Sequence, residues 1–295
     1  MNKRILIFTF TIFLLIGIFI NDNAKFNDGK LHLVFCNVGQ GDAIFIKTPN
    51  GDDILIDGGP DESVLNCLSN HMPFWDRTIE VMVLTHPHAD HLTGLISVLK
   101  RYEVIHYFTE NVKNNTSIYK RLEDTLAEKK ITAKLTYSGD RIDFSDKTKL
   151  LTVWPDENWF NSKKLQGSQD LKKDDISLDV NGFSVIQVLS YGNFKALLTG
   201  DAGVEIEERI SRQVGEIDVL KVPHHGSKSG MSDYFLSEIN PSLAVISVAA
   251  KNRYGHPAKT MLDLLEKHNI KTLRTDVNKE VELVSDGKTF NIYSN

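Results

Sequence analysis

Residues 85–91 read Thr85-His86-Pro87-His88-Ala89-Asp90-His91 and directly follow the apolar run 81–84. This stretch places three imidazoles and a carboxylate within six residues. Neutral imidazole and carboxylate are ligands that suit Zn²⁺ or Mn²⁺. Without a cation between them, four such groups in one loop would repel one another or lose hydration energy without compensation. The pattern therefore predicts a metal site at the end of a buried strand.

The other clustered histidines lie in similar places along the chain. His224 and His225 follow the apolar run 219–222, and His256 lies in a turn after the run 243–248. Open α/β sheets place their chemistry at the ends of core strands, so these side chains are expected to meet the first cluster. The remaining four of the ten histidines have no partner motif.

The body of the chain alternates short β-rich runs with amphipathic helical stretches, without a linker or a repeat. This alternation predicts one continuous α/β domain over residues 31–293. Its first strands are expected at 31–37, 43–48 and 53–57, followed by a helix at about 61–70 and another that begins near Leu92. The polar, Lys/Asp-rich stretch 156–175 is expected to be a surface loop.

The N-terminus carries an export or anchoring signal. Lys3 and Arg4 precede an apolar run at 5–20, after which the chain turns polar. A helix of that length reaches about 24 Å, slightly short of a typical ~30 Å hydrocarbon core. Residues 1–24 are therefore predicted to be a signal anchor or a signal peptide, with the body extracytoplasmic. We favour the retained anchor, because the nearest candidate cleavage site begins with Asp22; a buried helix of a cytosolic fold is the alternative.

Charge and cysteine content narrow the functional classes. The net charge of −5 argues against a protein that coats nucleic acid by charge alone. Lys221, Lys228 and Lys251 lie near the predicted site and are candidates to meet phosphates. The two cysteines, Cys36 and Cys67, leave both a disulfide and two buried thiols open, with the thiols favoured at least as much as the disulfide.

The HxHxDH stretch is the signature of the metallo-β-lactamase fold, and the chain resembles that superfamily over nearly its whole body. Two further motifs follow in the family's order: Asp57-Gly58-Gly59 and Leu198-Thr199-Gly200-Asp201. A closer resemblance is to the metallo-β-lactamase domain of ComEC/Rec2-type DNA-uptake proteins, which carry this domain beside many membrane helices. It rests on residues 85–94 and on Asn37-Val38-Gly39-Gln40-Gly41-Asp42-Ala43, Val222-Pro223-His224-His225-Gly226-Ser227 and Arg253-Tyr254-Gly255-His256-Pro257. The resemblance implies an α/β fold, a four-layer αβ/βα sandwich, to which the apolar run near the N-terminus adds a hydrophobic helix.

The resemblance also implies two divalent metal ions, Zn²⁺ or Mn²⁺, that activate a shared water. Its ligand set would be His86 and His88 on one metal, Asp90 and His91 on the second, and Asp201 between them. The second metal needs one more histidine, for which we favour His225 over His256.

Two departures from the family pattern affect the first metal. The first motif begins with Asn37 where the family usually has Asp, and no histidine between His106 and His224 corresponds to the superfamily's third ligand of that metal. Asp175 lies about where that histidine would be and is the candidate oxygen ligand.

These assignments lead to a functional prediction. Asp90 and His224 are the predicted catalytic residues, with His224 donating a proton to the leaving oxygen or a hydrogen bond to phosphate. The predicted substrate-binding residues on the opposite wall are Ser227, Asn252, Tyr254 and His256.

The predicted function is that of an extracytoplasmic metal-dependent hydrolase, a phosphodiesterase or nuclease of ComEC/Rec2 type. Its expected partners are a phosphodiester substrate, with DNA as a candidate, and the membrane through the N-terminal segment; no obligate protein partner is evident. A strand end or a small substrate is favoured over a duplex because the body is negatively charged. The alternatives are a cell-wall (teichoic acid) phosphodiesterase or phosphocholine esterase, and a non-catalytic binding module on the same fold.

Overall fold

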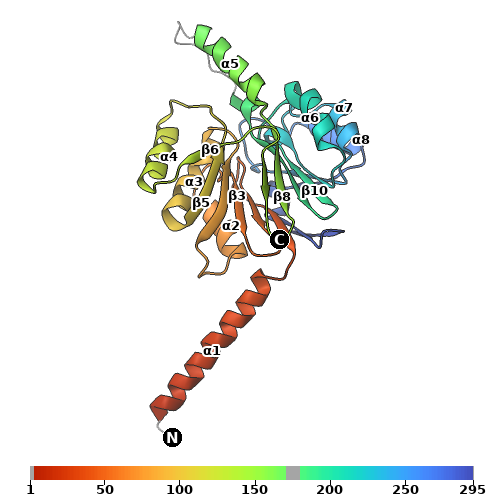
Figure 1. Cartoon of the computed structure of the whole chain (residues 1–295). Coiled ribbons are helices and arrows are strands. Elements are labelled where there is room, and N and C mark those ends of the chain that lie inside the picture. Colours follow the sequence, from red (N-terminus) through yellow and green to blue (C-terminus); the bar gives the residue numbers. More distant parts are fainter. Residues whose placement is uncertain (1–2, 171–179, 295) are drawn as a thin grey trace.

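Two β-sheets form the centre of the molecule (Figure 1). The computed structural model describes residues 3–170 and 180–294. The eight-stranded sheet has the order β15 (Phe290–Ser294), β14 (Val281–Ser285), β1 (Leu31–Phe35), β2 (Ile44–Lys47), β3 (Asp53–Ile56), β4 (Thr78–Leu84), β5 (Glu103–Thr109) and β6 (Ala133–Leu135). The seven-stranded sheet has the order β13 (Lys271–Arg274), β12 (Leu243–Ile246), β11 (Val219–Lys221), β10 (Phe194–Leu198), β9 (Ile186–Tyr191), β8 (Lys149–Trp154) and β7 (Arg141–Asp143).

Each sheet is mixed. Strands β3 to β6 are parallel, as are β10 to β13, and the other pairings are antiparallel. The inner parallel strands β3, β4, β11 and β12 are mostly apolar because they are buried on both faces, and Ile54 and Leu55 are fully buried in β3.

Helices cover the outer faces of both sheets. The helices are α1 (Lys3–Phe26), α2 (Val64–His71), α3 (Ala89–Arg101), α4 (Ser117–Glu128), α5 (Glu157–Asp170), α6 (Glu207–Val214), α7 (Asp233–Ile239), α8 (Lys259–Lys267) and the short α9 (Thr275–Asn278). One core packs α2, α3 and α4 on the eight-stranded sheet, a second packs α6, α7 and α8 on the other, and a third fills the space between the sheets. This arrangement confirms the predicted four-layer αβ/βα sandwich.

Helix α3 begins three residues earlier than predicted. Its N-cap is His88, and Asp90 lies in its first turn, where a carboxylate is favoured by the helix dipole. The apolar positions behave as the pattern predicts, since Leu92, Leu95 and Leu99 are fully buried. The consequence is that Asp90 and His91 are held by a helix and not by a loop.

The prediction of a loop over 156–175 is wrong for its described part, because residues 157–170 form α5. The Asp156 side chain accepts a hydrogen bond from the backbone N–H of Trp159 and so begins the helix. The rings of Trp159 and Phe160 then pack near Phe183, at 5.1 and 5.3 Å between centroids. The Lys/Asp-rich composition led to the loop prediction, which did not take the packing of Trp159 and Phe160 into account.

At the N-terminus, the expected helix is present as α1, which projects from the body at the end opposite α5 (Figure 1). Over the residues that the structure describes, none of the helices has both the length and the hydropathy to cross a membrane.

The two cysteines form a disulfide with a Cα–Cα distance of 5.7 Å. It joins Cys36, just after β1, to Cys67 of α2, and both residues are buried. Of the two possibilities that the sequence leaves open, the structure contains the disulfide.

Candidate metal centre

The site lies where strands of both sheets end. Strand β4 leads into residues 85–91, β10 leads into Asp201, and β11 leads into the short 3₁₀ turn η3 (Pro223–Gly226). The two sheets are joined at this edge, because the backbone N–H of Val185 donates a hydrogen bond of 2.9 Å to the carbonyl of Thr85. The clusters that are far apart in sequence therefore share one edge.

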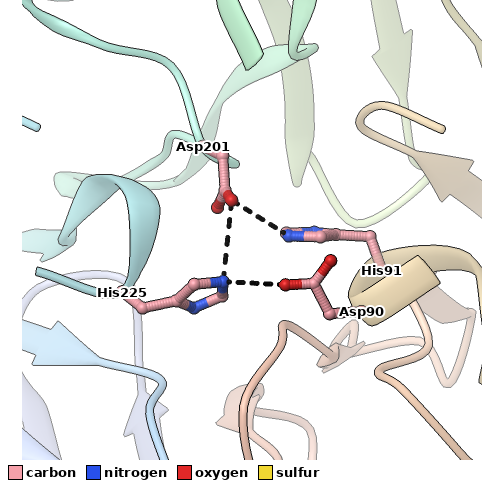
Figure 2. Close-up of side chains that lie close together, drawn as sticks. All are labelled: Asp90, His91, Asp201 and His225. Atoms are coloured by element: carbon pink, nitrogen blue, oxygen red, sulfur yellow. Dashed lines mark ion pairs between the residues drawn. The ribbon is translucent and has the colours of Figure 1, made fainter. Parts of the chain in front are cut away.

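Four side chains converge there: Asp90, His91, Asp201 and His225 (Figure 2). Each offers one ligand atom, and these atoms all lie within 4.8 Å of one another. Oδ2 of Asp201 lies 3.4 Å from Nε2 of His91 and 3.6 Å from Nε2 of His225, whose Nε2 is also 3.5 Å from Oδ2 of Asp90. These four are the residues that the sequence assigned to the second metal. His225, which we favoured over His256 as the additional histidine, is the one that lies beside Asp90 and Asp201.

The donor atoms fit a cation. Nε2 of His91 and Nε2 of His225 are buried and form no hydrogen bond with any residue that the structure describes. Buried polar atoms normally have partners, and leaving one without a partner is costly. Two imidazole nitrogens and two carboxylates in this arrangement are the donor types that Zn²⁺ and Mn²⁺ take.

Hydrogen bonds on the far side of each ring point the ligand nitrogens into the site. Nδ1 of His225 lies 2.9 Å from the carbonyl of Ser247. A carbonyl only accepts, so Nδ1 carries a proton, and Nε2 offers its lone pair whenever the ring is neutral. Nδ1 of His91 lies 2.8 Å from Oδ2 of Asp57, and that carboxylate also accepts hydrogen bonds from the N–H and hydroxyl of Thr85. Such outer partners orient metal-binding histidines in many proteins.

Charges within the group reinforce one another. Burial alone would lower the pKa of His91, but the carboxylates of Asp201 and Asp57 outweigh it and hold that pKa well above its ordinary value. Burial alone would raise the pKa of Asp201, but His225 and His91 hold it well below its ordinary value. The centre thus retains positive charge on its histidines, and a cation would displace those protons as it binds.

The predicted first-metal pair lies beside this group. Nε2 of His86 is 3.1 Å from Nδ1 of His88 and 3.9 Å from Oδ2 of Asp201. His86 is fully buried, and burial together with the charge of His91 lowers its pKa well below the ordinary value, which keeps the ring in its neutral, ligating form. Asp175, the candidate third ligand, lies outside the described residues.

A pocket of about 260 Å³ opens onto the centre. It is lined by Gln40, His88, Ala89, Asp90, Asn181, Asp201, His224, His225, Tyr254 and His256. His224 and His225 both have left-handed backbone, with φ of 49° and 53°, a strained conformation that places both rings on the site. The ring of His224 lies 5.6 Å from that of His256, which in turn stacks near Tyr254 at 5.7 Å.

Two residues predicted to bind substrate, Asn252 and Ser227, form hydrogen bonds within their own loops. The Asn252 amide donates to the carbonyls of Ala249 and His256, and its oxygen accepts from the N–H groups of Tyr254 and His256. Ser227 is buried, with its Oγ 3.3 Å from Oγ of Ser229. Among the described residues, the pocket lining includes neither Asn252 nor Ser227. Asn252 thus holds the loop that presents Tyr254 and His256.

Lys221 does not meet solvent, so its predicted contact with a phosphate is wrong. Its side chain is fully buried and forms an ion pair with Asp42. Sequence reasoning also missed Asp57 as the partner of His91, treating it only as part of a turn. The available signal was a charged residue directly after an apolar strand, because such a residue requires a partner if it is buried.

Comparisons with known proteins agree with this geometry. A sequence profile of the Metallo-beta-lactamase superfamily matches residues 36–113. The structure of Zn²⁺-bound PqqB from Methylobacterium extorquens aligns over 82% of this chain and 97% of that protein, with 10% identity and a TM-score of 0.54. The chain has the metallo-β-lactamase fold.

The curated relatives are competence and recombination proteins. The chain is 26% identical to ComE operon protein 3 of Bacillus subtilis, over 90% of this chain and 34% of that protein. It is 27% identical to Recombination protein 2 of Haemophilus influenzae, over 84% of this chain and 28% of that protein. The predicted resemblance to the metallo-β-lactamase domain of ComEC/Rec2 proteins is confirmed, and the chain spans about a third of the length of these two relatives.

Proposed function

We propose that this protein is a metal-dependent hydrolase that cleaves phosphodiester bonds. The observation that carries the proposal is the convergence of Asp90, His91, Asp201 and His225, with buried ligand atoms that lack hydrogen-bond partners, on a pocket open to solvent. The similarity to competence and recombination proteins favours a nucleic-acid substrate over other phosphodiesters.

The residues divide into two metal positions. Asp90, His91 and His225 would hold one cation, and His86 and His88 would hold a second. Asp201 would contribute to both, since its Oδ2 lies 3.4 Å from Nε2 of His91 and 3.9 Å from Nε2 of His86. Divalent cations supply Lewis-acid stabilisation of the charge that develops on a phosphoryl group.

Proton transfer falls to Asp90 and His224. Burial would raise the pKa of Asp90, but the neighbouring His225 imidazole, 3.5 Å away, and the charge of His91 hold it well below its ordinary value. Its ionised carboxylate is a proton acceptor for an attacking water at the pocket floor. The His224 side chain is 33% exposed, and its Nε2 lies 3.9 Å from Oδ2 of Asp201, so the ring reaches both the centre and the substrate. His224 donates a proton to the leaving oxygen.

The pocket favours a single strand end or a small phosphodiester. Its volume of about 260 Å³ accommodates a group of nucleotide size and not a duplex. The Arg253 guanidinium lies 5.0 Å from the centre of the Tyr254 ring and places a positive charge at the rim. That charge attracts a phosphate and repels the trimethylammonium group of phosphocholine, so the teichoic-acid esterase is the second candidate.

Hydrolysis of bis-p-nitrophenyl phosphate with Mn²⁺ or Zn²⁺ tests the proposal. The wild type should hydrolyse it, and the double variant Asp90→Ala/His91→Ala should be inactive. The matched control is Asp233→Ala/His268→Ala, which removes a surface pair of the same residue types, 2.7 Å apart, and should keep full activity. A wild type that binds no metal and hydrolyses no phosphodiester would leave the non-catalytic binding module. Cleavage of choline-bearing teichoic acid but not of single-stranded DNA would favour the second candidate.

The proposed place of the reaction is outside the cytoplasm. The basic N-terminus followed by an apolar run supports export, and so does the Cys36–Cys67 disulfide, because structural disulfides persist in oxidising compartments. Fusion of alkaline phosphatase to the C-terminus should give an active reporter. An inactive fusion that accumulates in the cytoplasm would contradict this placement.

A further inference from the structure

A buried ion pair lies directly beneath the metal centre. Lys221 is at the end of β11, and its ammonium group contacts Oδ2 of Asp42, in the loop between β1 and β2. It also donates a 2.8 Å hydrogen bond to the carbonyl of Gly200 and lies 3.9 Å from Oδ1 of Asp201. Lys221 thus links Asp42 to the segment that carries the central carboxylate.

Lys221 and the histidines approach Asp201 from different sides. Oδ1 faces the ammonium group, whereas Oδ2 faces Nε2 of both His91 and His225. The ion pair therefore selects the carboxylate rotamer that offers one oxygen to the centre.

Asp42 is tied to the other ligands. Its Oδ1 lies 3.5 Å from Nδ1 of His225, and its backbone N–H donates a 3.3 Å hydrogen bond to the carbonyl of Asp90. Gly41 allows this approach, since a Cβ there would lie 2.1 Å from the same carbonyl oxygen. Asp42 and Lys221 therefore fix the positions of three segments relative to one another, those that carry Asp90, Asp201 and His225.

Stability alone does not account for the pair. Removing two charges from water costs free energy that their attraction often fails to recover, and well-packed apolar residues of similar volume are commonly as stable or more so. The side chains of Lys221 and Asp42 are 0% and 2% exposed, so this cost applies in full.

We propose that Lys221 and Asp42 are positioning residues that set the geometry of the metal ligands. The inference rests on the proposed metal-dependent function. The proposal predicts that removing the positive charge of Lys221 weakens metal binding. By charge alone, removing a cation next to a metal site strengthens metal binding, whereas loss of positioning weakens it.

The test compares two buried ion pairs in the full-length protein. At the centre, the variants are Lys221→Met, Asp42→Asn and the double variant. The matched control is Lys47 with Asp53, 2.6 Å apart and 5% and 1% exposed, at the opposite end of β3 from Asp57. Its variants are Lys47→Met, Asp53→Asn and their double. Calorimetric titration of metal-free protein with Mn²⁺ gives the Kd, and urea unfolding in EDTA gives the stability without metal.

Each central variant should bind Mn²⁺ about 10- to 100-fold more weakly, the effect usual for outer partners of metal ligands. The double variant should recover stability, because no unpaired charge remains, and still bind weakly. The control variants should change stability only. Tighter binding by Lys221→Met, or wild-type binding by the double variant, would overturn the positioning role while leaving the proposed function intact. A wild type that binds no Mn²⁺ would overturn both proposals.

Discussion

Replacing Asp57 with asparagine should weaken metal binding through His91. Oδ1 of Asp57 accepts the N–H of Thr85 at 2.8 Å, and Oδ2 accepts the hydroxyl of Thr85 at 2.7 Å and Nδ1 of His91 at 2.8 Å. An amide that keeps its oxygen on the Thr85 N–H presents its NH₂ group to Nδ1. The His91 ring must then carry its proton on Nε2, which removes the lone pair that faces the centre.

The backbone should tolerate this change. Asp57 has a left-handed φ of 59°, and asparagine adopts that region at least as readily as aspartate. The effect of the variant therefore reports on the hydrogen bond and not on strain.

The expected loss is about 10- to 100-fold in metal affinity, or about 1.4 to 2.7 kcal/mol. Titration of metal-free protein with Mn²⁺ measures it, and kcat/KM on bis-p-nitrophenyl phosphate should fall in parallel when metal is limiting. Asp61→Asn is the control, because within the described part of the chain that exposed side chain accepts one hydrogen bond, from the Ser63 N–H. An Asp57→Asn variant that binds Mn²⁺ within twofold of the wild type would refute the role assigned to this carboxylate.

Two further predictions concern stability. Burial raises the pKa of Glu110 from 4.5 to about 8, so the unfolded state releases its proton first and stability falls as pH rises from 4.5 to 8. Glu110→Gln should remove this fall, worth up to roughly 5 kcal/mol above pH 8, and equal unfolding free energies of the two proteins at pH 9 in urea and EDTA would contradict it. In Gly94→Ala, the new Cβ would lie 1.9 Å from the carbonyl oxygen of Gly58. It should lower the urea unfolding free energy by about 3 kcal/mol, whereas Ser97→Ala on the same helix should change it little; a stable Gly94→Ala protein would show that α3 can move away from Gly58.

Candidate ligands could be predicted from the sequence because their pattern is local. The spacing of the histidines and the aspartate within residues 85–91 predicts a metal site, and the apolar run before them predicts a buried strand. The rule that strand ends meet at one edge predicted that the clusters lie together, whereas the choice of His225 over His256 came from the family resemblance. The four-layer sandwich came from the same resemblance and is confirmed.

Other predictions failed because they depended on contacts between distant segments. The polar stretch 156–175 gave no sign that Trp159 and Phe160 would pack near Phe183 and support a helix. Asn252 is a separate case, because its amide is engaged by local hydrogen bonds to the carbonyls of Ala249 and His256, which its residue type alone does not reveal.

The sequence by itself determined the inventory of the centre: which imidazoles and carboxylates follow buried strands, and in what order. Only the tertiary structure decided which of them have unpaired ligand atoms, which rings are oriented from behind by Asp57 or Ser247, and that Lys221 faces inward. The physical reason is that spacing along a chain specifies a residue's neighbours within one element, whereas burial, protonation and hydrogen bonding depend on side chains from other strands. A lysine in an apolar strand reads as a surface residue until Asp42, 179 positions earlier in the chain, is seen beside it.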